Sequence, residues 1–191
     1  VELITFSAAN EHGRHNIDKI VVFDNGHGMN VDLLQRSLSF GQGDNKLDDT
    51  GMGKFGFGLP SASISQCKRV DVWSWTEADE AYTTHIDVDE MLAGDGEEVA
   101  LPIKQALPDY IAQAIGDILP ASGTVILWSK IDRAKWKTSS ALSKHVEHEI
   151  GRMYRYFIAR EEAPTTIRFK SFDKRGSAYA LRDNAENYRA S

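Results

Sequence analysis

Two glycine-rich segments carry the residues of this sequence that are best suited to bind a ligand. The first begins at Asp24, directly after an apolar β-branched run at 20–23. An ionised carboxylate accepts hydrogen bonds but cannot donate them, so Asp24 suits the exocyclic amine of adenine and rejects the oxygen of guanine. Gly26 and Gly28 allow a tight turn and leave room for a flat ring, with Met29 as a soft wall. By itself, D-x-G-x-G also fits an ordinary loop or a cation-binding turn.

The second segment, 51–56, matches the pattern G-x-G-x-x-G. A dinucleotide-binding loop of this pattern follows an apolar strand, whereas residues 46–50 are mostly polar. A Walker A loop needs Ser or Thr after its lysine, but Phe55 follows Lys54. The remaining interpretation is a backbone that approaches a phosphate, helped by the first amides of the next helix and by the charge of Lys54. A flexible loop whose glycines only serve turns is the alternative.

The composition limits the class of protein. The chain has 191 residues, of which 41% are hydrophobic and 26% charged, so a disordered tail or a fibrous repeat is excluded. No apolar run approaches the roughly 18 residues of a membrane helix. The net charge of -6 gives no global attraction to nucleic acid. Because a single cysteine, Cys67, cannot form an internal disulfide, we expect a cytoplasmic location.

Hydrophobic periodicity predicts the elements that must position the two segments. The predicted strands are 1–6, 17–23, 70–75, 82–88 and 124–128, with strand-like sequence again from 165. The predicted helices are 31–40, 55–67, 108–118 and 137–160, and polar loops are expected at 7–16 and 41–53. Asn30 stands where a helix N-cap belongs. Since strands and helices do not alternate strictly, the pattern favours an α+β two-layer architecture.

Taken together, the two segments resemble the motifs of the GHKL ATPases, which include gyrase B, the ninety-kilodalton heat-shock chaperones, histidine kinases and MutL proteins. Residues 53–63 look most like the heat-shock chaperone and MORC (microrchidia) branch, and 122–125 look like the late Gly-Thr motif. The resemblance covers residues 1–160. It implies the Bergerat sandwich, a mixed and mostly antiparallel sheet with helices on one face. Residues 161–191 are expected to begin a following strand-rich or transducer-like segment.

The resemblance also implies a binding site for ATP and Mg²⁺. Asp24 would bind the adenine amine, while Gly28 and Met29, next to Gly26, line the adenine pocket. Thr124 would hydrogen-bond near Asp24. The phosphates would be wrapped by residues that share one loop, namely Gly51, Gly53, Lys54, Phe55, Gly56, Phe57 and Gly58. The loop 41–53 would form the lid over the nucleotide.

The family's general base and magnesium ligand lie on an N-box helix of the pattern Glu-x-x-x-Asn. No such pattern precedes the first strand, and Glu11 follows that strand in a polar loop. We therefore expect the N-box upstream of Val1, and no catalytic residue or metal ligand is assigned in this chain. His145 and His148 lie in a charged stretch that is typical of a solvated helix face.

The expected function is that of a MORC-like GHKL ATP-binding domain. Lid closure and slow hydrolysis by direct attack of water would drive a conformational change or an ATP-dependent homodimerisation, with a protein or DNA partner acting through other domains and no membrane. One alternative is a regulatory or scaffold module that binds nucleotide without hydrolysing it. Another, which the motifs fit less well, is the ATP-binding domain of a histidine kinase.

Overall fold

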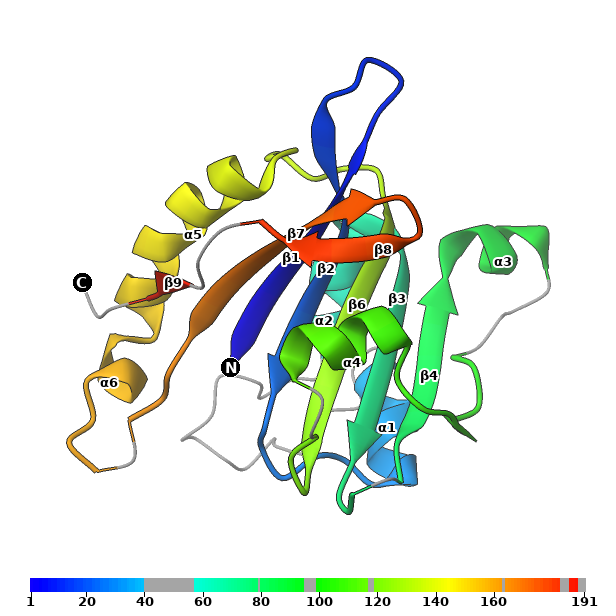
Figure 1. The fold of residues 1–191 in the computed structure, drawn as a ribbon. Coiled ribbons are helices and arrows are strands. Elements are labelled where there is room, and N and C mark those ends of the chain that lie inside the picture. Colours follow the sequence, from blue (N-terminus) through cyan, green and yellow to red (C-terminus); the bar gives the residue numbers. More distant parts are fainter. Residues whose placement is uncertain are drawn as a thin grey trace.

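The computed structural model describes residues 1–39, 57–78, 80–94, 99–116, 119–162, 164–182 and 186–188 (Figure 1). The strands are β1 Glu2–Ala9, β2 His15–Asp24, β3 Cys67–Trp75, β4 Tyr82–Asp87, β5 Ile103–Lys104, β6 Gly123–Ile131, β7 Arg168–Arg175, β8 Ala178–Leu181 and β9 Glu186–Asn187. The helices are α1 Val31–Ser37, α2 Gly58–Ile64, α3 Val88–Ala93, α4 Asp109–Ile115, α5 Ser139–Met153 and α6 Arg155–Ile158. None of the described helices is long and apolar enough to cross a membrane.

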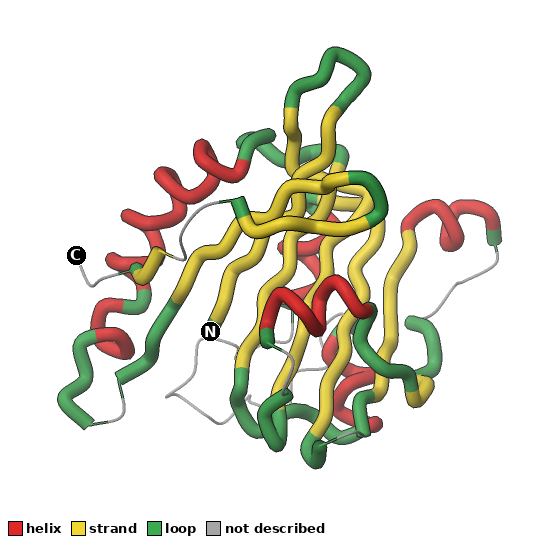
Figure 2. The backbone as a smooth tube through the Cα atoms, viewed as in Figure 1, coloured by secondary structure: helices red, strands yellow, loops and turns green. Residues whose placement is uncertain are grey.

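All the described strands belong to one sheet, in the order β5-β4-β3-β6-β2-β1-β7-β8, with β9 paired to β7 (Figure 2). The pairing between β1 and β7 is parallel, and the other pairings between described strands are antiparallel. This confirms the mixed, mostly antiparallel sheet of the predicted α+β sandwich. The strands β3, β6 and β2 lie at its centre, and their ends carry the candidate site.

Helices cover one face of the sheet because alternate residues of each strand point to that face. Leu34 of α1 and Leu38, which caps the end of that helix, pack against Val70 and Val72 of β3, and α2 contributes partly buried side chains to the same cluster. The helix α5 packs on this face as well, at the β1–β7 side of the sheet.

The opposite face is covered in part by α4, an addition to the predicted arrangement of helices on one face. Ile111 and Ala114 of α4 are buried against Trp73 of β3 and Val125 of β6. Lys170 of β7 donates a hydrogen bond to the carbonyl oxygen of Ala114 at 3.1 Å. A cation at the end of a helix, where unpaired carbonyls gather, stabilises that end.

The helix predicted at 55–67 is shorter in the structure, because α2 ends at Ile64. Cys67 was expected to end that helix, but it is the first residue of β3 and pairs with Ile131 of β6. Residues 55 and 56 lie outside the described residues. The boundary was predicted wrongly because it depends on a tertiary contact. Residues 67–69 pair with β6 and so belong to the strand, although two of them are charged.

The predicted helix 137–160 is interrupted at Tyr154, which separates α5 from α6. Tyr154 has φ -100° and ψ 10°, outside the helical region. Gly151 lies in the last turn of α5, where its low helix propensity weakens the helix. The amphipathic pattern therefore predicted a helix in this region correctly but missed the interruption at Tyr154.

The predicted loop 7–16 is also shorter, since β1 continues to Ala9 and β2 starts at His15. The side chain of Asn10 accepts hydrogen bonds from the backbone amides of His12 at 3.0 Å and Arg14 at 2.9 Å. These bonds close a tight turn, and they allow the two strands to remain paired up to it.

The strands after residue 160 belong to the same sheet, because β7 pairs with β1. Ile167, which precedes β7, and Phe169 of β7 are buried beneath the α5 side chains Leu142 and Val146. The start of a separate segment at 161 remains a prediction.

Candidate functional site

A row of polar side chains crosses the three central strands near one end of the sheet. Asp24 of β2 pairs with Thr124 of β6, and Thr124 pairs with Ser74 of β3. Directly paired residues of antiparallel strands point to the same face. Ser74 continues the alternation of Val70 and Val72, so the row lies on the face covered by α1 and α2.

The carboxylate of Asp24 is held by the turn that follows it. Its Oδ1 accepts a hydrogen bond from the backbone amide of Gly26 at 2.9 Å. The hydroxyl of Ser122 donates to the carbonyl oxygen of Gly26 at 2.8 Å, which ties the turn to the segment before β6. Asp24 itself is only partly buried, so it remains accessible to a ligand.

Gly28 is required by both its backbone conformation and its surroundings. Its φ is +70°, and a Cβ at this position would lie 2.0 Å from the carbonyl oxygen of Trp75. Gly123 is similarly confined, because its Cβ would lie 2.7 Å from the carbonyl oxygen of Asp24. These two glycines let the turn after β2 lie directly against the ends of β3 and β6.

Met29 is fixed by β3 and leads into α1. Its backbone amide donates to Ser74 Oγ at 2.8 Å, and its side chain is partly buried against the α1–α2 cluster. The next residue, Asn30, is the predicted N-cap, and its side chain accepts from the amide of Leu33 at 2.8 Å. The prediction of Asn30 as a cap is therefore confirmed.

The phosphate-type loop is described only at its end. Phe57 precedes α2 and is 52% exposed, and Gly58 is the first residue of that helix. Leu59 packs into the same cluster as Met29. The other predicted phosphate-binding residues, Gly51, Gly53, Lys54, Phe55 and Gly56, lie outside the described residues, as does the whole of the predicted lid 41–53.

The structure thus brings Asp24, Gly26, Gly28, Met29 and Thr124 together at one end of the sheet. Ser74 was not among the predicted site residues, although the sequence indicates it. It continues the apolar alternation of Val70 and Val72, and a small polar residue at such a buried position needs a hydrogen-bond partner.

No group of three or more potential metal ligands occurs among the described residues. His145 stacks on the ring of Trp136, with the ring centroids 4.6 Å apart, and both side chains lie on or beside α5.

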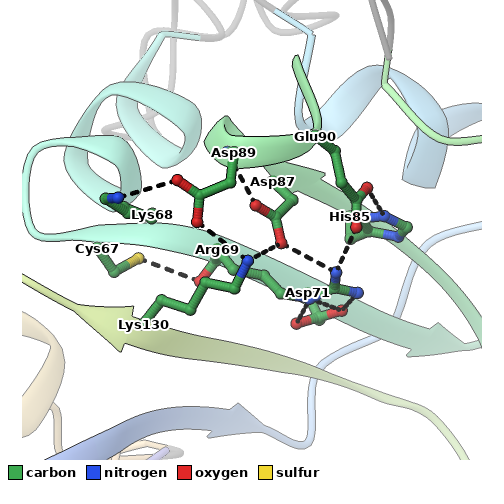
Figure 3. A network of polar contacts seen from close by, with 9 residues as sticks. All are labelled: Cys67, Lys68, Arg69, Asp71, His85, Asp87, Asp89, Glu90 and Lys130. Carbon is green, nitrogen blue, oxygen red and sulfur yellow. Dashed lines mark hydrogen bonds and ion pairs between the residues drawn. The ribbon is translucent and has the colours of Figure 1, made fainter. Parts of the chain in front are cut away.

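A second polar cluster lies at the opposite end of β3 and β6, where α3 begins (Figure 3). Asp87, whose side chain is 1% exposed, accepts from Lys130 Nζ at 2.7 Å and from Arg69 Nη1 at 3.2 Å. Arg69 also pairs with Asp71 and Glu90. The helix α3 has no buried residue, and it is linked to the sheet by ion pairs of Glu90 with Arg69 and of Asp89 with Lys68 and Lys130.

This second cluster makes stability dependent on pH. Burial alone raises the pKa of Asp87, but hydrogen bonds from Lys130 and Arg69 outweigh it, so that the pKa lies below the usual 3.8. A lowered native pKa adds stability above the unfolded pKa, and this is lost as the pH falls through the native value. We therefore expect Asp87→Asn to destabilise the chain at about pH 5 much more than at about pH 3. Urea unfolding at both pH values would measure this, and an equal difference at both would contradict it.

The fold and the polar row define a class of protein, the nucleotide-binding α+β sandwich with a carboxylate at the end of a central strand. Residues 3–116 match the family described as histidine kinase-, DNA gyrase B-, and HSP90-like ATPase. The chain belongs to this family, whose fold is the Bergerat sandwich and whose membership supports ATP binding. No curated protein matches the chain significantly.

Proposed function

We propose that the chain binds the adenine of ATP at the row formed by Asp24 and Thr124. The observation that carries this proposal is the turn at Gly28, which has no space for a side chain and joins the Asp24 carboxylate to the ends of β3 and β6. Asp24 is the only ionisable side chain of that row. A carboxylate that accepts and cannot donate selects the 6-amino group of adenine.

Met29, whose side chain packs partly buried on the cluster of α1 and β3, would provide an apolar wall for the adenine. Gly26 places its amide on Asp24 Oδ1 and thereby orients the carboxylate. The phosphates, with Mg²⁺, would extend toward the loop that ends at Phe57 and Gly58. Backbone amides of a glycine-rich loop that leads into a helix suit phosphate oxygens, and Lys54 would add a positive charge.

We propose further that lid closure over ATP is coupled to slow hydrolysis and to a conformational change or homodimerisation, as in a MORC-like ATPase in the cytoplasm. The motif at 53–63 supports this choice of branch. A module that binds ATP without hydrolysing it is the second candidate, since no general base is assigned from the sequence. Any Glu-x-x-x-Asn pattern found upstream of residue 1 would favour hydrolysis.

Asp24→Asn is expected to weaken ATP binding about 10- to 150-fold, because a hydrogen bond to a charged acceptor contributes about 1.5–3 kcal/mol. Asparagine also presents N–H donors to the amine of adenine. Calorimetric titration with Mg²⁺ and a non-hydrolysable ATP analogue would measure the affinity.

Asp18→Asn is a matched control, because Asp18 lies on the same strand, is exposed and is far from the row. It should leave the affinity unchanged. Equal losses in the two variants, or no loss in Asp24→Asn, would refute the assignment of Asp24.

A further inference from the structure

Ser74 lies at the buried end of the polar row and contacts three groups, one from the turn after β2 and two from the start of β6. Its Oγ is 2.8 Å from the amide nitrogen of Met29, 3.0 Å from the carbonyl oxygen of Gly123 and 3.0 Å from Thr124 Oγ1. Ser74 is 1% exposed and Thr124 is 8% exposed. These hydroxyls are therefore shielded from solvent, and their protons must be shared among the groups nearby.

A serine hydroxyl has one proton to donate and two lone pairs with which to accept. The Met29 amide can only donate to Ser74, and the Gly123 carbonyl can only accept from it. Once the proton of Ser74 is directed to Gly123, its contact with Thr124 requires Thr124 to be the donor. Ser74 then accepts from both Met29 and Thr124, and all its hydrogen-bonding capacity is used.

This arrangement makes the hydroxyl of Thr124 a hydrogen-bond acceptor toward any further partner. Because Thr124 directs its proton to Ser74, its oxygen has only lone pairs left for another partner. Since β6 lies between β3 and β2, the neighbour of Thr124 on its other side is Asp24. Both Thr124 and Asp24 then act as acceptors beside the proposed adenine pocket.

We infer that Ser74 is a specificity-determining positioning residue that makes Thr124 an acceptor and so favours a 6-amino over a 6-oxo purine. This inference rests on the proposed adenine site. A 6-amino group carries two N–H donors for two acceptors, directly or through a water. A 6-oxo group presents a third acceptor to the same place, and its lone pairs find no donor there.

Ser74→Ala frees the proton of Thr124, which can then be donated to a 6-oxo purine. The ratio of the Kd for inosine triphosphate to the Kd for ATP is expected to fall about fivefold, the effect of one neutral hydrogen bond. If Ser74 had a purely structural role, Ser74→Ala would weaken the binding of both nucleotides equally and leave this ratio unchanged. Ser74→Thr keeps the hydroxyl and should keep the wild-type ratio.

The measurement is calorimetric titration of each variant with the two nucleotides and Mg²⁺, after its fold has been checked by thermal unfolding. A second set of variants makes the test independent of how Ser74→Thr folds. In a Thr124→Val background, Ser74→Ala should not change the ratio further, because the proton in question is already gone. A fivefold fall there as well, or an unchanged ratio in Ser74→Ala alone, would overturn the inference. Failure of the wild type to bind ATP would instead overturn the proposed adenine site, and this inference with it.

Discussion

Gly28→Ala is expected to destabilise the chain by about 2–5 kcal/mol and to abolish ATP binding. A left-handed backbone costs a residue with a side chain about 1–2 kcal/mol, and overpacking costs about 1–3 kcal/mol more. The new Cβ would lie 2.0 Å from a backbone oxygen of Trp75, so β3 or the turn must move. Either movement separates Met29 from Ser74 and displaces Asp24 from the row.

The matched control is Gly13→Ala, in the turn between β1 and β2. Gly13 has a φ of +73°, close to the +70° of Gly28, but a Cβ there would meet no atom within 4 Å. Gly13→Ala should therefore lower the free energy of unfolding only by the cost of the left-handed backbone, and it should retain ATP binding. Urea unfolding gives the free energies, and titration gives the affinity. Similar results for both variants would mean that close packing at Gly28 does not form the site.

Asp87→Ala is expected to lower the free energy of unfolding by about 3 kcal/mol, because it leaves two cations without their buried partner. The side chain of Asp87 also accepts from the amide of Asp89 at 3.0 Å, so the first turn of α3 loses its cap. The expected loss is at the low end for a buried ion pair, because Arg69 keeps Asp71 and Lys130 keeps Asp89.

Two control variants separate the effect of the Asp87 charge from the effect of Asp87 as the N-cap of α3. Asparagine is as good a cap as aspartate, so Asp87→Asn should be less destabilising than Asp87→Ala by about 1 kcal/mol. Asp89→Ala removes only exposed ion pairs and should have little effect. Urea unfolding of the three variants tests this order. A loss in Asp89→Ala as large as that in Asp87→Ala would show that the burial of Asp87 is unimportant.

The parts of the site that the sequence predicted are those set by neighbours in the chain. The turn at 24–28 and the cap at Asn30 depend on glycine conformation and on hydrogen bonds over two or three residues, which a local pattern contains. The central strands were predicted for a similar reason, because the β-branched run at 20–23 and the apolar alternation at 70–75 are both contained in short stretches of sequence.

The parts that the sequence did not predict depend on distant residues. Ser74 bonds to Met29, 45 positions away, and only the strand order places them together. The boundary at Cys67 is set by pairing with Ile131 of β6. In the second polar cluster, Asp87 lies within the predicted strand 82–88, and only the strand order brings Arg69 and Lys130 to its carboxylate.

Recognition of the adenine amine by Asp24 would be visible in a crystal structure with Mg²⁺ and a non-hydrolysable ATP analogue. We expect the 6-amino nitrogen to lie about 3 Å from a carboxylate oxygen of Asp24, beside Thr124. An adenine bound elsewhere, or one whose amine faces away from Asp24, would contradict it.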